Sequence, residues 1–244
     1  MNIAERIREA LLPRAAHDEI ADITVGRIYA AVTLASGGFG VAHLGGAHGP
    51  RRTPPPPDAG SGPRDPAEVL PHLGGDDPFA SALASATASA LATADIGPLP
   101  EGDVVDRLAV SDGDRVVMVG GFPIDTAIKE RGGVLSVFDR GWGIGNMDEL
   151  PAALSDADIV IVTATAVINN TIDDILEHIH SARETVLLGP STILIPEAFR
   201  GTPVTRLFGI VPRDVSAVRD AVEKGGGTRD FIRHAKKVEA AVPG

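Results

Sequence analysis

Three apolar runs in the second half of the chain each end on a small or hydroxyl-bearing turn. They are VVMVGGFP at residues 116–123, DIVIVTATAVINNT at residues 158–171 and TVLLGPSTILIP at residues 185–196. Continuous apolar runs of this length are typical of parallel strands that are buried on both faces. Ligands of such sheets bind in a crevice at the carboxyl ends of the strands. The pattern therefore predicts a ligand site at the turns that follow these runs.

The same half of the chain alternates strand-like and helix-like segments. This alternation predicts an α/β fold with a Rossmann-like parallel sheet of about five strands. The expected strands cover residues 115–120, 134–139, 158–164, 185–188 and 204–211, and the expected helices cover residues 124–131, 147–155, 170–182, 197–199, 214–223 and 229–241.

The first half predicts a small α+β unit. Isoleucine and leucine recur at helical spacing near the start, and Pro13 is expected to end that helix. Residues 22–35 are rich in β-branched side chains and are expected to form one strand, with Gly26 as a bulge. A Gly-Gly turn then leads into a second strand over residues 39–44, which completes a hairpin.

A proline-rich stretch interrupts this unit. Seven prolines within residues 50–66 exclude a helix or strand interior, so a surface loop or a disordered insertion is expected. Asp77 followed by Pro78 is typical of a helix start. The alanine-rich residues 79–94 then predict a helix, because alanine has the highest helix propensity, and their small side chains allow close approach to a neighbour.

Glycine and proline turns over residues 95–114 place a domain boundary there. The expected organisation is a small α+β domain over residues 1–109, with the insertion at residues 50–66, followed by a Rossmann-like domain over residues 110–244.

Composition narrows the classes of function. A net charge of −11 argues against a nucleic-acid-binding protein, because phosphate neutralisation needs clustered lysine and arginine. The absence of cysteine excludes disulfides, thiolate metal sites and a cysteine nucleophile. No apolar stretch approaches the ~20 residues of a membrane span, and the first residues lack the apolar core of a secretory signal. A cytoplasmic protein without a membrane partner is expected.

The first strand end resembles part of a dinucleotide-binding loop. Gly120 and Gly121 follow the strand, but the run to Pro123 lacks the complete G-x-G-x-x-G fingerprint. A tight turn and a pair of backbone amides close to a ligand are both consistent with this loop. Asp139 ends the next strand, 19 residues after Gly120, where an acid meets a ribose hydroxyl in nucleotide-binding folds. A local turn residue is an equally good interpretation of Asp139.

Polar residues gather at the next two strand ends. After the third strand, helix capping by Asn169 or Asn170 explains one of five polar side chains, and the excess indicates hydrogen bonds to a ligand. The fourth strand ends in Gly-Pro-Ser-Thr, which suits either a turn or a ligand contact. His178 and His180 are two residues apart on a helix and therefore cannot chelate one ion together. The candidate ligand-binding residues are Gly120, Gly121, Pro123, Asp139, Thr163, Thr165, Asn169, Thr171, Gly189, Ser191 and Thr192.

Together these segments resemble the family described as "putative heavy-metal chelation", in which an enolase-N-terminal-like domain precedes a Rossmann-like domain. The matching pieces are VGGFP, VFD at residues 137–139, LPAALSDADIVIVTATAVINNTIDDIL at residues 150–176, LLGPSTILIP at residues 187–196 and GGGTRDFIRHAKKV near the end. The resemblance implies a site in the cleft between the two domains, completed across a homodimer. Relatives carry a glutamate where this chain has Asp139, and the proline-rich insertion also departs from the family pattern.

The favoured hypothesis is a protein that binds a small polar or anionic ligand, such as a metal ion or a metal chelate, at these strand ends. The sequence assigns neither catalytic residues nor metal ligands, and oxygen ligands suit hard cations better than soft ones. One alternative is a nucleotide- or S-adenosylmethionine-dependent enzyme with an altered glycine loop. Another is an interaction subunit without its own ligand, which predicts a crevice filled by side chains.

Overall fold

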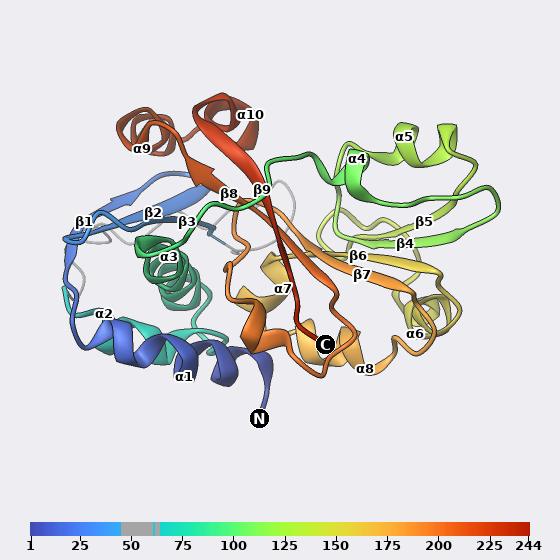
Figure 1. The fold of residues 1–244 in the computed structure, drawn as a ribbon, viewed down its shortest axis with the longest axis horizontal. Coiled ribbons are helices and arrows are strands. Elements are labelled where there is room, and N and C mark those ends of the chain that lie inside the picture. The colour runs from blue at the N-terminus through green and yellow to red at the C-terminus, as the bar shows by residue number, and fades with distance from the viewer. Residues whose placement is uncertain (45–60, 62–63) are drawn as a thin grey trace.

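Two β-sheets organise the computed structural model, which describes residues 1–44, 61 and 64–244 (Figure 1). Thirteen of the seventeen residues of the proline-rich segment at residues 50–66 lie outside the described residues. The strands are β1 (Ile20–Val25), β2 (Tyr29–Leu34), β3 (Phe39–His43), β4 (Arg115–Val119), β5 (Val134–Phe138), β6 (Ile159–Thr163), β7 (Glu184–Leu188), β8 (Arg206–Pro212) and β9 (Ala235–Ala241). The α-helices are α1 (Ile3–Ala15), α2 (Pro66–Val69), α3 (Pro78–Ala94), α4 (Val104–Arg107), α5 (Asp125–Glu130), α6 (Leu150–Ser155), α7 (Thr165–Ile168), α8 (Ile172–Glu177), α9 (Val215–Glu223) and α10 (Thr228–Phe231). Short 3₁₀ segments cover Leu70–His72, Met147–Glu149, Pro196–Phe199 and Ile232–His234.

The larger sheet confirms the predicted Rossmann-like α/β fold. Its strand order is β5-β4-β6-β7-β8-β9, and the first five of these strands are parallel. Strands β5 and β6 lie on opposite sides of β4, so the chain reverses its direction of travel across the sheet at β4 and β6. Parallel sheets bind their ligands at such a switch point, outside the carboxyl ends of the strands.

The prediction of a helix over residues 229–241 is wrong. Residues 228–234 form only short helical turns, and β9 then pairs antiparallel with β8 along seven residue pairs. The sequence AKKVEAA favours a helix by local propensity. Ala235, Val238 and Ala240 become buried when this segment pairs with β8, and this tertiary context outweighs the helix propensity.

The smaller sheet has three antiparallel strands where the sequence predicted two. The expected strand over residues 22–35 is divided into β1 and β2, and Gly26 lies in the turn between them, where its N–H donates to the Tyr29 carbonyl at 2.9 Å. Gly26 is therefore a turn residue rather than a bulge. Pro13 lies inside α1, which continues to Ala15. A proline near the end of a helix removes only one of its last hydrogen bonds, so the helix persists for two more residues.

Helix α3 is almost completely buried, and it approaches β3 as closely as its small side chains predicted. Asp77 caps the helix by accepting hydrogen bonds from the N–H groups of Phe79 and Ala80. A Cβ atom placed on Gly40 of β3 would lie only 2.2 Å from the Ala86 carbonyl oxygen of α3. Glycine in the strand and alanine in the helix therefore allow the two backbones to touch.

The three-stranded sheet lies between α3 on one face and α9 and α10 on the other (Figure 1). On the second face, Tyr29, Phe39 and Val41 pack in one hydrophobic cluster with Val222 of α9 and Phe231 of α10. Residues from the end of the chain thus complete the core of the first unit. The predicted division at residues 109 and 110 stays a prediction. Within the described part of the chain, no helix has both the length and the apolar character needed to cross a membrane.

Candidate functional site

A cavity of about 1270 Å³ opens at the carboxyl ends of β4, β5, β6 and β7. Pockets for drug-sized ligands measure about 300–1,000 Å³, so this cavity has room for a metabolite or cofactor. Ten of the eleven candidate residues predicted from the sequence line it, namely Gly120, Gly121, Pro123, Asp139, Thr163, Thr165, Asn169, Thr171, Gly189 and Ser191. Thr192 is not among the lining residues. The four strand ends thus meet at one cavity.

The glycine turn after β4 brings its backbone to the cavity surface. Gly120 has a φ of 105°, and a Cβ on it would lie 2.7 Å from Cβ of Thr163, so glycine is required here both for conformation and for space. Its N–H donates to the Phe138 carbonyl at 2.8 Å and is therefore used within the fold. No hydrogen bond among the described residues uses the N–H of Gly121. Of the two predicted backbone amides, only that of Gly121 remains available to a ligand.

Asp139 shapes the turn after β5 and also faces the glycine turn. Its Oδ1 accepts hydrogen bonds from the N–H groups of Gly141 and Trp142, at 2.9 and 3.1 Å. Among the described residues other than the two neighbours of Gly121, its Oδ2 is the only atom within 4 Å of a Cβ built on Gly121, at 3.4 Å. Asp139 is therefore a turn residue through its Oδ1 atom, as one of the two interpretations predicted. Its Oδ2 atom lies beside the glycine turn after β4.

The end of β6 presents paired hydroxyl groups. The hydroxyls of Thr163 and Thr165 lie 3.0 Å apart and hydrogen bond to each other. The helix expected over residues 170–182 is shorter than predicted, since α8 covers only Ile172–Glu177. The short helix α7 (Thr165–Ile168) precedes it and was not predicted, and Asn170 lies between the two with a φ of 54°. Neither Asn169 nor Asn170 caps the second helix, because Thr171 occupies its N-cap without a side-chain hydrogen bond. Asn169 and Thr171 line the cavity.

The turn after β7 divides its two hydroxyl residues between different roles. The Ser191 hydroxyl accepts a hydrogen bond from the N–H of His43 at 2.9 Å and so connects this turn to β3. Thr192 is 3% exposed and donates its hydroxyl to the Phe208 carbonyl at 2.8 Å. Its hydrogen bond is satisfied inside the fold, and its side chain is directed away from the cavity.

Several lining residues were missed by the sequence reasoning. Tyr29 and His43 reach the cavity from the three-stranded sheet, and their rings make an edge-to-face contact with centroids 5.3 Å apart. Tyr29 also hydrogen bonds to the Thr228 hydroxyl of α10 at 2.8 Å. Trp142 and Arg229 line the cavity as well. Tyr29, His43 and Arg229 lie far from the strand ends along the chain, so no local pattern marks them, although the glycine run at residues 225–227 before α10 indicates a turn.

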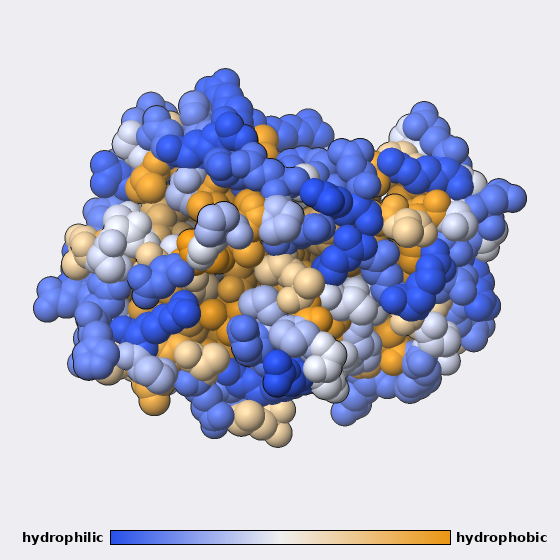
Figure 2. Space-filling model, viewed as in Figure 1, coloured by the Kyte–Doolittle hydropathy of each residue, from blue (hydrophilic) through white to orange (hydrophobic). Residues whose placement is uncertain are grey.

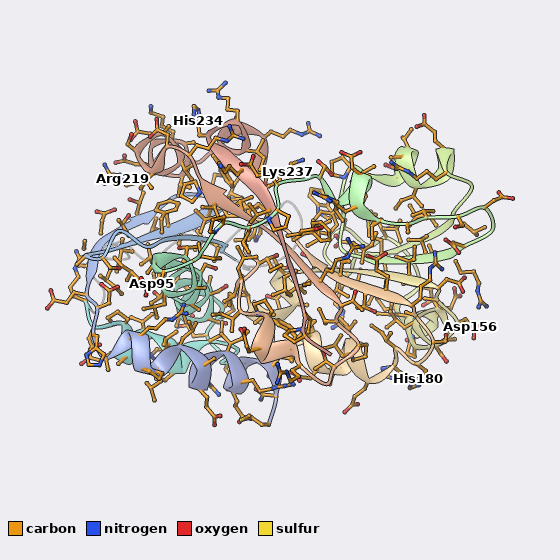
Figure 3. The ribbon with its side chains drawn as sticks, in the orientation of Figure 1. Asp95, Asp156, His180, Arg219, His234 and Lys237 are labelled. Atoms are coloured by element: carbon orange, nitrogen blue, oxygen red, sulfur yellow. The ribbon has the colours of Figure 1, made fainter. Side chains whose placement is uncertain are left out.

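Asp103 carries a stable negative charge at the cavity wall. Burial of the side chain raises the pKa of Asp103, but hydrogen bonds from the Lys237 ammonium and the Val105 N–H outweigh it and leave the pKa below its ordinary value. Lys237 lies on β9 beside the segment that leads into α4 (Figure 3). The pair fixes this segment to the edge of the larger sheet.

Replacing Asp103 by asparagine is expected to lower the free energy of unfolding at pH 7 by less than about 1 kcal/mol, because the side chain is 33% exposed. Asparagine also caps helices well, so only the ion pair is lost. Because the folded-state pKa is lowered, the ionised carboxylate stabilises the fold above the ordinary pKa of 3.8, and this contribution disappears as the pH falls further. Urea unfolding at pH 7 and at a series of pH values below 3.8 measures the difference. Asp106→Asn, which removes an equal charge three residues later within α4, is the control variant.

The described residues contain no group of three or more histidine, aspartate or glutamate side chains placed to hold a metal ion. His178 lines the cavity, whereas His180 lies beyond α8 at the periphery (Figure 3). Helix α8 ends at Glu177, so the helical spacing on which the expectation about these two histidines rested is absent. Figure 2 shows a mainly hydrophilic surface, with hydrophobic residues visible in a hollow between the three-stranded sheet and α1, where the buried helix α3 lies.

Two models of protein families described as "Putative heavy-metal chelation" match the chain, DUF4213 at residues 8–92 and DUF364 at residues 103–241. Two crystal structures of DUF364 proteins of unknown function have the same fold. The one from Pyrococcus horikoshii is 21% identical with a TM-score of 0.85, and the match covers 99% of this chain and 100% of that one. The one from Desulfitobacterium hafniense DCB-2 is 16% identical with a TM-score of 0.80, covering 97% and 99%. No curated protein matches the sequence. The chain therefore belongs to the DUF364 family, described as "Putative heavy-metal chelation".

Proposed function

We propose that the protein binds a small polar organic ligand that carries a metal ion as a chelate, in the cavity at the strand ends. The observation that supports this most is the open cavity at the switch point between β4 and β6, lined by both sheets. A subunit without its own ligand would have filled this crevice with side chains. The family description points to metal chelation as the relevant chemistry.

The polar groups of the cavity suit a ligand with several oxygen or nitrogen atoms. The Gly121 N–H and the paired threonine hydroxyls offer hydrogen bonds, and Asp139 offers a carboxylate. Arg140 and Arg229 also line the cavity, and neither makes an ion pair within the described part of the chain. Unpaired arginines in a chain of net charge −11 favour an anionic group on the ligand.

The donor set favours a chelate over a bare ion. A metal ion held by the protein alone needs several converging side chains, and the described residues supply no such group. A chelate brings its own donor atoms and requires only hydrogen bonds and charge complementarity from the protein. The carboxylate and hydroxyl oxygens of the cavity suit hard cations, and they can supplement the donor atoms of a chelate but cannot replace them.

Thermal unfolding and calorimetric titration with nickel compounds test this proposal. The probes are Ni²⁺ alone and its complexes with two iminodiacetate or two dipicolinate ligands, in which six donor atoms saturate the metal. At one hundred times Kd, binding stabilises the folded state by about 2.7 kcal/mol, so at least one complex should raise Tm by several degrees. Ni²⁺ alone should leave Tm unchanged.

Gly121→Ala locates the binding. The added methyl group would lie 3.4 Å from Oδ2 of Asp139, an ordinary contact that leaves the fold intact but narrows the cavity. We expect this variant to keep its Tm without ligand and to lose the stabilisation by the complex. Gly97→Ala, whose methyl group meets nothing within 4 Å, is the matched control and should bind normally.

The proposal fails if neither complex changes Tm and native mass spectrometry finds no small molecule copurifying with the protein. It also fails if Ni²⁺ alone stabilises the protein as strongly as the complexes. NAD, NADP, ATP and S-adenosylmethionine belong in the same thermal screen, because a response to one of them would favour the enzyme hypothesis.

A further inference from the structure

Trp142 is the only tryptophan of the chain, and it is 65% exposed at the lining of the cavity. It belongs to none of the three hydrophobic clusters that form the core of the described residues. Fold stability therefore does not account for its presence. A large aromatic side chain left in water beside a cavity indicates a surface that is covered when a ligand is present.

The backbone holds Trp142 in a defined position. Residues 140–143 form a tight loop between Asp139 and Ile144, whose N–H and carbonyl groups hydrogen bond to each other in both directions, at 2.8 and 2.9 Å. The Trp142 N–H donates to Oδ1 of Asp139, and Gly143 follows with a φ of 63°. The carboxylate that lies beside the glycine turn thus also fixes the residue that carries the indole ring.

From this arrangement we propose that Trp142 stacks on a planar, conjugated ring of the ligand, so that the natural ligand is an aromatic or heteroaromatic chelator. This inference rests on the proposed function and specifies its ligand class. An indole face is large, apolar and electron-rich, and its favoured partners are flat rings and cations. A cation is disfavoured as the partner of the indole ring because Arg140, two residues before Trp142, also lines the cavity and would repel it.

The remaining cavity wall fits the same ligand class. Phe122, Phe138 and Met147 supply apolar surface next to the polar strand ends. A flat ring with anionic substituents satisfies both kinds of surface, since its faces meet apolar side chains and its edge meets the amide and hydroxyl groups. A flexible aliphatic chelator would leave the indole exposed.

The two nickel complexes form a matched pair of probes for this inference. Dipicolinate and iminodiacetate offer the same oxygen, nitrogen and oxygen donors and the same charge, but only dipicolinate contains a planar aromatic ring. We expect the wild-type protein to bind the dipicolinate complex roughly tenfold more tightly, since aromatic contacts contribute on the order of 1 kcal/mol. Binding should also quench the fluorescence of the single tryptophan.

Variants at the loop separate stacking from other roles. Trp142→Ala should abolish the preference for the aromatic complex, and Trp142→Phe should retain most of it, as measured by calorimetric titration. Ile144→Ala is the control, because it removes another exposed apolar side chain from the same loop that does not line the cavity. It should keep the preference.

Three results would overturn the inference while leaving the proposed function intact. The first is equal affinity of the wild-type protein for the two complexes. The second is an unchanged preference of Trp142→Ala for the dipicolinate complex. The third is a change in the oligomeric state of Trp142→Ala while its preference for the dipicolinate complex stays the same. The last result would assign Trp142 to an interface between copies of the chain. Failure of both complexes to bind, together with the absence of a copurifying small molecule, would instead contradict the proposed function itself.

Discussion

Replacing Gly40 by alanine is expected to lower the free energy of unfolding by about 3 kcal/mol, at the upper end of the cost of overpacking a core. The added Cβ would lie 2.2 Å from the Ala86 carbonyl oxygen and 2.5 Å from the Ala90 nitrogen. Both contacts are with the backbone of α3, which cannot rotate away as a side chain would. The helix must shift as a whole, and its packing on the three-stranded sheet is lost.

Urea unfolding followed by circular dichroism measures this effect. Gly97→Ala introduces the same methyl group where a Cβ meets no atom within 4 Å, so its free energy of unfolding should change by less than about 1 kcal/mol. Equal stability of the two variants would contradict the close contact between β3 and α3.

Truncating Phe231 to alanine is expected to cost about 3–5 kcal/mol, because the side chain is completely buried and the truncation leaves a large cavity. Phe231 packs edge-to-face against Tyr29, with ring centroids 5.1 Å apart. Its loss therefore loosens α10 from the three-stranded sheet. Since α10 also carries Thr228 and Arg229 to the cavity, amide exchange in this helix should accelerate as well.

Hydrogen exchange and urea unfolding together test this prediction. Phe231→Leu keeps most of the buried volume and should cost less than half as much. A small effect of the alanine variant on both stability and exchange would show that α10 is not held by this ring.

The Rossmann-like sheet was predictable because its strands are buried on both faces and therefore appear as continuous apolar runs. Strand β9 was not, because AKKVEAA has the local propensity of a helix and acquires strand conformation only from its partner β8. The division of residues 22–35 into two strands was not predictable either, because a glycine such as Gly26 is equally compatible with a bulge within one strand and with a turn between two strands.

The part of the candidate site that follows directly from the parallel strands was predictable. Residues that directly follow a parallel strand must meet at one edge, and ten of the eleven predicted residues line one cavity. Thr192 lies one residue beyond Ser191 and is directed into the core, a distinction that depends on the exact turn geometry. Tyr29 and His43 were missed because only the packing of distant segments brings them to the cavity. Trp142 lies three residues after the predicted Asp139, and it was missed because an apolar residue in a turn does not by itself indicate a ligand site.

The cover of the three-stranded sheet has a consequence for biosynthesis. One face of β2 and β3 packs on α9 and α10, which lie more than a hundred residues later in the chain. During translation that face, with Tyr29, Phe39 and Val41, remains open to solvent until residues 215–231 have left the ribosome. The first unit therefore acquires its complete hydrophobic core only after α9 and α10 have emerged, and the nascent chain carries an exposed apolar surface for chaperones until then.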